Sequence, residues 1–308
     1  MRQLKVSGHP VSRSIRHLWG MAGTCPNCGT SLAVEMHYCP SCGQEQRERV
    51  VPVGQMLLDI LRDNFAFDSK VFSSVPKLLF RPGFLTAEFV AGRRVRYIPA
   101  VRLYVFISVV AFLIVSIPTR DSFVQDGRLI DNEKPGAKIS GMDAAMAEVD
   151  SMGVEAWKRT HLNKGDLAER FGNKLILVNH QGLMPVVLER YRRQLPLPLL
   201  LLVPLVALVL KLLVWRAYYV VHLVSAFHWA AFVLLTFALL HLLDVALGTA
   251  IAGFAFVLGL VYLAMALHRV HALGWIRAVL STVVVGTVAL ALLGASMLAT
   301  MIVVLEQM

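Results

Sequence analysis

Residues 220–243, VVHLVSAFHWAAFVLLTFALLHLL, form an apolar run that contains no Asp, Glu, Lys or Arg. A helix that crosses a bilayer needs about 20 consecutive, predominantly apolar residues. This run is long enough, and the tyrosines at 218 and 219 suit the membrane–water interface. The stretch 218–243 therefore predicts a transmembrane helix.

The composition of the whole chain agrees with this prediction. Hydrophobic residues make up 56% of the 308 residues, and charged residues make up 16%. Soluble domains are about 45–50% apolar and about 25% charged. The composition excludes a disordered chain, a disulfide-stapled secreted domain, a coiled coil and an ordinary soluble enzyme. It predicts a polytopic membrane protein.

Four other stretches are apolar enough to cross a bilayer. Prolines at 196, 198 and 204 should bend one of them in its early half, and glycines at 248, 253 and 259 suit close helix packing in another. We expect an all-α polytopic membrane protein with about five transmembrane helices, at 98–117, 195–214, 218–243, 245–267 and 278–305.

All four cysteines lie in two C-x-x-C pairs, Cys25/Cys28 and Cys39/Cys42. This spacing lets two thiolates converge on one ion, and the glycine after each pair lets the backbone leave the turn with a positive φ. Ten residues separate the pairs, enough for a short hairpin that joins them. A set of four thiolates leaves no open position, so we expect one structural Zn²⁺ per chain. Two disulfides or redox-active pairs are the alternatives.

The segments around this ribbon, which we place at 21–46, are polar or amphipathic. Residues 1–20 are basic and lack the apolar core of a signal peptide, so we expect a flexible tail. Between 47 and 97 the apolar residues follow a helical period, but none of the stretches is long enough to span. These helices lie either on the cytosolic face of the bilayer or in a small soluble subdomain beneath it.

Charge and cysteine chemistry predict the orientation. Reduced thiolates argue for a cytosolic N-terminus. Arg93, Arg94 and Arg96 precede the first span, mark its cytosolic end and should contact anionic lipid headgroups. Residues 1–97 carry 13 Lys and Arg against 7 Asp and Glu, whereas 118–194 carry 12 against 11. We expect 118–194 to be an extracytoplasmic loop.

This topology places the C-terminus outside the cytosol and the protein in a bacterial inner membrane. The formal net charge of +10 then records mainly which side faces the cytosol. A nucleic-acid partner is not needed to explain it, and we expect none.

Some polar residues fall inside the predicted spans, where each is a functional candidate. Arg102, Tyr218, His222 and His228 form a possible intramembrane polar site. At 100° per residue, however, the two histidines point to different faces of their helix. They are either interhelical hydrogen-bonding groups, parts of a substrate or proton pathway, or metal ligands. Arg102 can also reach back towards cytosolic phosphates.

Several pieces of the sequence resemble one bacterial family. They are Cys39–Gln44 (CPSCGQ), Leu79–Gly83 (LFRPG), Gly92–Pro99 (GRRVRYIP) and Tyr218–Val224 (YYVVHLV), the last followed by Phe227-His228. The chain is similar to the zinc-ribbon, multi-pass membrane proteins grouped as domain of unknown function 3667. Because no activity is established for that family, the resemblance implies architecture only, and it draws attention to the tyrosine and histidines of the last piece.

No phosphate-binding loop, nucleophile elbow, zinc-protease or dinucleotide motif occurs in the chain. Whether the protein is an enzyme therefore stays open, and we lean against it. We expect a membrane protein whose zinc ribbon is an interaction module for a cytosolic protein partner. The alternatives are a transporter or channel-like protein, in which a homo-oligomer could build the pore, and a membrane enzyme acting on lipid or envelope precursors.

Overall fold

The structure is a computed structural model, and it is mostly helical. The predicted tail at 1–20 and the amphipathic residues up to 69 lie outside the described residues. The described residues are 23–33, 36–45, 70–117, 124–125, 128–129, 142–162, 167–194 and 196–307.

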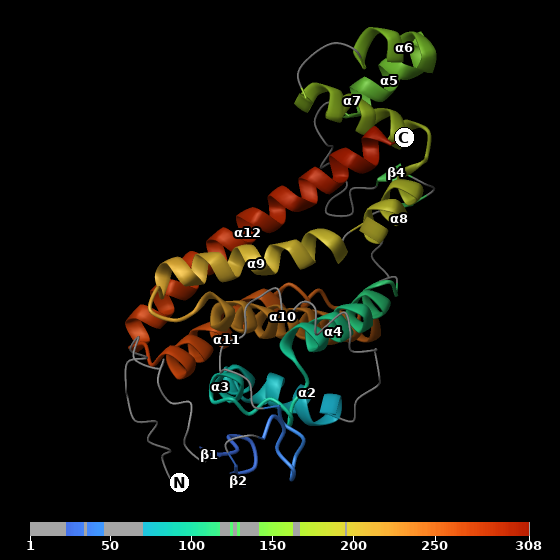
Figure 1. Ribbon diagram of the computed structural model, residues 1–308. Coiled ribbons are helices and arrows are strands. Elements are labelled where there is room, and N and C mark those ends of the chain that lie inside the picture. Colours follow the sequence, from blue (N-terminus) through green and yellow to red (C-terminus); the bar gives the residue numbers. More distant parts are fainter. Residues whose placement is uncertain are drawn as a thin grey trace.

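The N-terminal ribbon is a small two-stranded unit (Figure 1). Strands β1 (Gly23–Thr24) and β2 (Ser31–Leu32) pair antiparallel, with Gly23 opposite Leu32. A single bridge between Tyr38 and Glu45 closes the second half of the ribbon. The described core of this unit consists of cysteines around Leu32, so it buries little apolar surface.

Two short helices connect the ribbon region to the bundle. They are α2 (Lys70–Phe80) and α3 (Phe84–Val90), within the segment 47–97 where the apolar residues follow a helical period. Gly83 sits between them with φ 70°, a left-handed conformation that glycine adopts without steric cost. Because α3 packs against two apolar helices, α10 (Tyr219–Leu247) and α11 (Phe254–His271), it belongs to the bundle.

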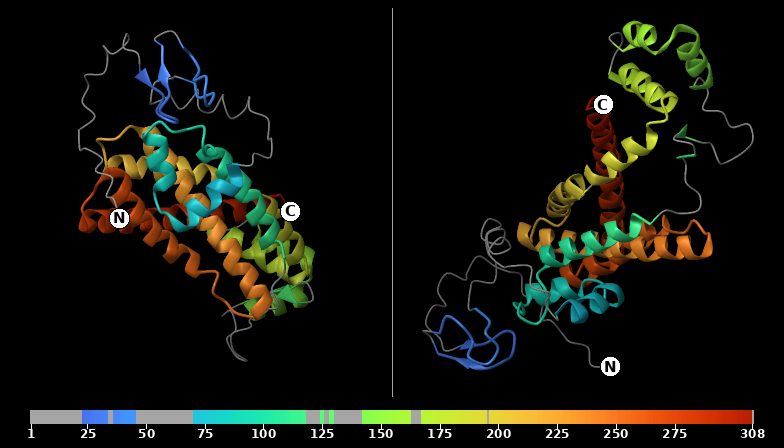
Figure 2. Two further views of the ribbon diagram at one scale, coloured as in Figure 1. Left: turned by 90° about the horizontal axis from the view of Figure 1, so that it is seen from below. Right: turned by 90° about the vertical axis from the view of Figure 1, so that its right-hand side faces the viewer.

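The bundle itself consists of five apolar helices. Helix α10 (Tyr219–Leu247) packs against three of the other four. They are α4 (Ala100–Val115), α9 (Pro196–Leu213) and α11 (Phe254–His271). The fifth helix, α12 (Trp275–Glu306), crosses α9 and α11 and continues to the far end of the molecule (Figure 2).

Three of these helices, α10, α11 and α12, are long and apolar enough to cross a membrane. The other two are shorter than predicted. Pro99 caps α4, so this helix runs only from 100 to 115 instead of 98–117. Sixteen residues span about 24 Å, less than the roughly 30 Å of a hydrocarbon core. The apolar part of α9 is equally short, at Pro198–Leu213.

The helices around the predicted fourth span, 245–267, have different boundaries from that span. Its first residues belong to α10, which ends at Gly248 with φ 67°. The loop that follows is held by the Asp244 carboxylate, which accepts hydrogen bonds from the Thr249 hydroxyl and the Ile251 and Ala252 N–H groups at 2.8–2.9 Å. Helix α11 starts only after this loop.

The described residues of the predicted loop 118–194 form helices and two short strands. They are β3 (Val124–Gln125), β4 (Arg128–Leu129), α5 (Met142–Met152), α6 (Val154–His161), α7 (Leu167–His180) and α8 (Met184–Gln194). Trp157 is buried among the first of these helices. The end of α12 packs against α7 and α8, and Lys174 pairs with Glu306 at 2.8 Å. These helices and the C-terminus lie opposite the end that carries β1 and β2 (Figure 1).

The outer surface of the bundle is apolar. Ile276 of α12 is 78% exposed, and similarly exposed Leu, Val and Phe side chains continue along α11 and α12. A soluble protein would leave few such contiguous patches in water. The exposed apolar faces therefore indicate insertion into a membrane.

Candidate functional site

The four cysteines come together, as their spacing predicts. Their Sγ atoms all lie within 4.8 Å of one another, and no described cysteine forms a disulfide. Cys25 and Cys39 are each 2% exposed, while Cys28 is on the surface. The disulfide alternative therefore does not describe this structure.

Both C-x-x-C turns have the same backbone design. The Gly29 N–H donates to the Cys25 carbonyl and the Gly43 N–H to the Cys39 carbonyl, each at 2.8 Å. Both glycines have positive φ, 79° and 70°. Because the turn is repeated, both thiols of each C-x-x-C pair face the thiols of the other pair.

The spacing of the sulfur atoms suits a tetrahedral ion. Cys25 and Cys42 are 3.7 Å apart, and Cys28 and Cys39 are 3.5 Å apart. Four ligands at about 2.3 Å from a tetrahedral zinc would be about 3.8 Å from one another. The set can thus hold one metal ion, and it leaves no ligand position for a substrate.

The thiols have unequal surroundings. The Thr30 side chain, with its Oγ1 at 3.2 Å, and the Thr30 backbone lower the pKa of Cys28 to about 6. Burial raises the pKa of Cys39 to about 11. Bound metal would favour the thiolate at every position, because only the deprotonated sulfur is a ligand.

The ribbon is attached to the membrane-proximal chain through Gln44. This side chain is 5% exposed. Its Nε2 donates to the Gly92 carbonyl at 2.8 Å, and its Oε1 accepts from the Arg94 N–H at 3.3 Å. Both partners lie only a few residues before α4, so the cluster of four cysteines is fixed close to the start of that helix.

The three arginines predicted to contact lipid have different surroundings. Arg93 forms a bidentate ion pair with Glu88, with Nε to Oε2 at 2.7 Å, and this contact raises the pKa of Arg93. Arg94 lies 4.9 Å from the ring centroid of Phe89. Arg96 is exposed. Two of the three thus help to hold α3 to the loop before α4, and contact with lipid stays a prediction.

The predicted intramembrane histidines bind different elements. Thr86 Oγ1 of α3 shares a hydrogen bond with His228 Nδ1 at 2.9 Å. His222 Nε2 donates to the Val214 carbonyl at 3.0 Å, and its ring stacks on that of His271 with centroids 4.9 Å apart. Each histidine therefore fastens α10 to another part of the bundle.

The other two members of that set lie at helix ends. Tyr218 is exposed and caps the N-terminus of α10. Arg102 is half-buried in the first turn of α4. The role of all four residues as one polar site stays a prediction.

Sequence reasoning missed Thr86, Gln44 and His271 as partners in these contacts. Thr86 is 142 residues from His228, and Gln44 is 48 residues from Gly92. For Thr86, the sequence offered one indication of such a contact, a polar residue on an otherwise apolar face of a helix. For Gln44, it was the position directly after the last C-x-x-C-G turn.

Comparison with known families gives one match. Residues 68–112 match the sequence model of a family described as protein of unknown function (DUF3667). The matched segment contains α2, α3 and most of α4, together with the loop that receives Gln44. The match and the cluster of four cysteines confirm the resemblance noted from the sequence. No curated protein and no solved structure matches the chain.

Proposed function

We propose that this chain is an integral protein of a bacterial inner membrane that presents a structural zinc ribbon to the cytosol as a docking module for a soluble protein partner. The observation that carries the proposal is the buried Gln44 side chain, bonded to Gly92 and Arg94. A ribbon fixed in this way has a defined orientation on the bundle, which a ribbon on a free tether would lack.

Zinc is the metal that the ligand set favours. Four soft thiolates select zinc, or iron–sulfur chemistry, over oxygen-binding cations. A single closed Cys₄ site built from two C-x-x-C turns suits structural zinc. Reduced cysteines also support a cytosolic position for the ribbon.

The arrangement of the helices supports five spans with the N-terminus in the cytosol. Three helices reach membrane-spanning length, and α4 and α9 are apolar helices packed among them. Interfacial residues beside α4 and α9 would complete those two spans. The ribbon and the C-terminus would then face opposite sides of the membrane, which agrees with their positions in Figure 1.

The exposed surface of the ribbon suits a protein partner. Met36 is 44% exposed and Tyr38 is 60% exposed, both on the segment that joins the two C-x-x-C turns. Methionine and tyrosine are enriched where proteins bind one another. Neither side chain belongs to the core of the ribbon, so both are available to a partner.

The test is site-specific photocrosslinking of the full-length protein in living cells. A photoreactive amino acid at position 38 should give a discrete adduct with one soluble protein. The same residue at position 72, where Phe72 is also exposed but lies on α2, provides the control. Cys39→Ser should abolish the adduct from position 38, because the ribbon cannot close around the metal.

Two results would contradict the proposal. One is an adduct from position 38 that persists in Cys39→Ser. The other is the same set of adducts from positions 38 and 72, which would indicate random neighbours instead of a docking surface.

A further inference from the structure

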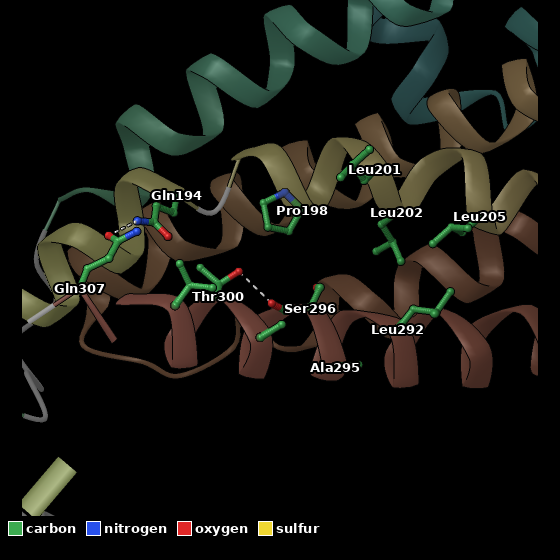
Figure 3. Close-up of a pocket in the computed structure, with 12 residues that line it drawn as sticks. Gln194, Pro198, Leu201, Leu202, Leu205, Leu292, Ala295, Ser296, Thr300 and Gln307 are labelled. Carbon is green, nitrogen blue, oxygen red and sulfur yellow. Dashed lines mark hydrogen bonds between the residues drawn. The ribbon is translucent and has the colours of Figure 1, made fainter. Parts of the chain in front are cut away.

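An open apolar cavity of about 860 Å³ lies between α9 and α12 (Figure 3). Its volume is within the range of about 300–1,000 Å³ typical of ligand sites. Leucines of α9 form one wall, including Leu201 and Leu205, and small residues of α12 form the other, including Ala295 and Ala299. Small side chains on one helix facing large ones on the other leave this space unfilled.

The interior of the cavity offers nothing to a polar ligand. Its two hydroxyl groups already donate within α12: Ser296 to the Leu293 carbonyl and Thr300 to the Ser296 carbonyl, both at 2.8 Å. The other interior side chains are apolar. In a membrane, the hydrocarbon chain of a lipid is the ligand that suits such a cavity.

The length of the cavity suits one acyl chain. Its lining residues on α12 extend from Leu292 to Gln307, fifteen positions or roughly 22 Å along the helix axis. One leaflet of a hydrocarbon core is about 15 Å deep, half of about 30 Å. The cavity is thus long enough to reach from the methyl end of an acyl chain to the lipid headgroup.

The mouth of the cavity is polar and positively charged. Gln194 Nε2 donates to Gln307 Oε1 at 3.4 Å, and Arg190 donates to the Gln307 carbonyl at 3.5 Å. Arg190 is an exposed cation on α8 beside this mouth. Its guanidinium is complementary to a phosphate group.

We infer that the cavity binds an anionic phospholipid, with one acyl chain between α9 and α12 and the phosphate beside Arg190. The inference is independent of the partner proposed for the zinc ribbon.

The test uses the full-length protein in vesicles that contain phosphatidylglycerol with a photoactivatable group in one acyl chain. Irradiation followed by mass spectrometry should place the label on cavity residues of α9 and α12. Ala299→Phe fills the cavity and should reduce this label roughly tenfold, the effect of excluding about two methylene groups. Ala291→Phe, at an exposed position of α12 outside the cavity, should leave it unchanged.

The headgroup is tested by Arg190→Gln, which should remove the preference for phosphatidylglycerol over a phosphatidylcholine probe. Arg159→Gln, an exposed arginine on α6, is the matched control. Labelling of the exposed face of α12 around Leu280 must persist in every variant, which separates loss of the site from failure to fold.

Three outcomes would overturn the inference. Labelling that is equal inside the cavity and at Leu280, and insensitive to Ala299→Phe, would mean ordinary annular lipid. Displacement of the label by a free fatty acid at equal concentration would mean a fatty-acid site. Equal labelling by both phospholipid probes in the unmodified protein would remove the role of Arg190.

Discussion

Gln44 connects two parts of the protein that the chain separates by 48 residues. Its amide has both a donor and an acceptor, and it uses them on neighbouring backbone groups, the Gly92 carbonyl and the Arg94 N–H. A carboxylate could satisfy only the second of these groups. Because the amide is buried, loss of either bond leaves a polar backbone group without its partner.

We therefore predict that Gln44→Glu and Gln44→Ala loosen the ribbon from the bundle. A buried hydrogen bond contributes about 0.5–1.5 kcal/mol, so local opening should become about 3- to 10-fold more frequent. Hydrogen–deuterium exchange at the Arg94 amide measures this directly. Ser41→Ala, an exposed change in the same ribbon, should leave that exchange unaltered. Unchanged exchange in both Gln44 variants would mean that the contact does not hold the ribbon.

For single residues, the sequence predicts which face of a helix a side chain occupies better than it predicts the hydrogen-bond partner of that side chain. The spacing of His222 and His228 correctly indicated two different faces of one helix, and the structure gives them different partners. The partner of His228 is Thr86, on a short helix far away in the chain. Helical periodicity describes one element, so it carries no information on which distant element covers each face.

At the scale of elements, the packing of α3 depends on the absence of a side chain at Gly83. A Cβ there would be 2.9 Å from the Cα of Ala266 in α11, a backbone atom that cannot move aside cheaply. The loop therefore approaches α11 as closely as backbone allows. Leu85, Thr86 and Glu88 of α3 are buried as a result.

Gly83→Ala should accordingly separate α3 from α11. The positive φ costs about 1–2 kcal/mol for an L-residue, and the clash adds about 1–3 kcal/mol of overpacking. Gly248→Ala is a matched control, since Gly248 has a similar φ of 67° but nothing within 4 Å of the added Cβ. Thermal unfolding of the purified protein should show a clearly larger loss for Gly83→Ala. Equal losses would mean that φ alone matters.

The helix boundaries show where sequence patterns were sufficient. Arg81-Pro82-Gly83 separates α2 from α3, because proline and glycine terminate helices by their own geometry. The next helix break was predicted at position 244 but lies after Leu247, because the residues on both sides of Gly248 are apolar. Its cause is the Asp244 carboxylate, which binds the loop backbone through contacts that hydropathy does not record.

At the scale of the whole molecule, the ribbon and the bundle differ in what stabilises them. The bundle has an extended apolar core that includes Leu103, Leu210 and Leu263. Among its described residues, the ribbon buries Leu32 as the one non-cysteine side chain of its core. A unit with so little buried apolar surface needs a metal to fold.

Removing the metal should thus unfold the ribbon alone. The purified protein should contain one zinc per chain, and a strong chelator should remove it. Amide exchange across 23–45 should then become fast, while α10 and α12 keep their protection. Cys42→Ser should have the same effect, and Ser41→Ala in the same turn should retain the zinc. Persistent protection of 23–45 after chelation would contradict the role assigned to the metal.

The membrane topology can be tested by labelling introduced cysteines, because all four native cysteines lie in the ribbon. Helix α5 lies at the end of the molecule opposite the ribbon, and α2 lies near the ribbon (Figure 1). Ser151 on α5 and Phe72 on α2 are both exposed. In spheroplasts, a membrane-impermeant maleimide should label Ser151→Cys but neither Phe72→Cys nor the unmodified protein. Permeabilisation should add Phe72→Cys, and chelation should then add the ribbon cysteines. An odd number of spans must separate positions 72 and 151 for this result, so labelling of both or neither in spheroplasts would contradict the predicted first span.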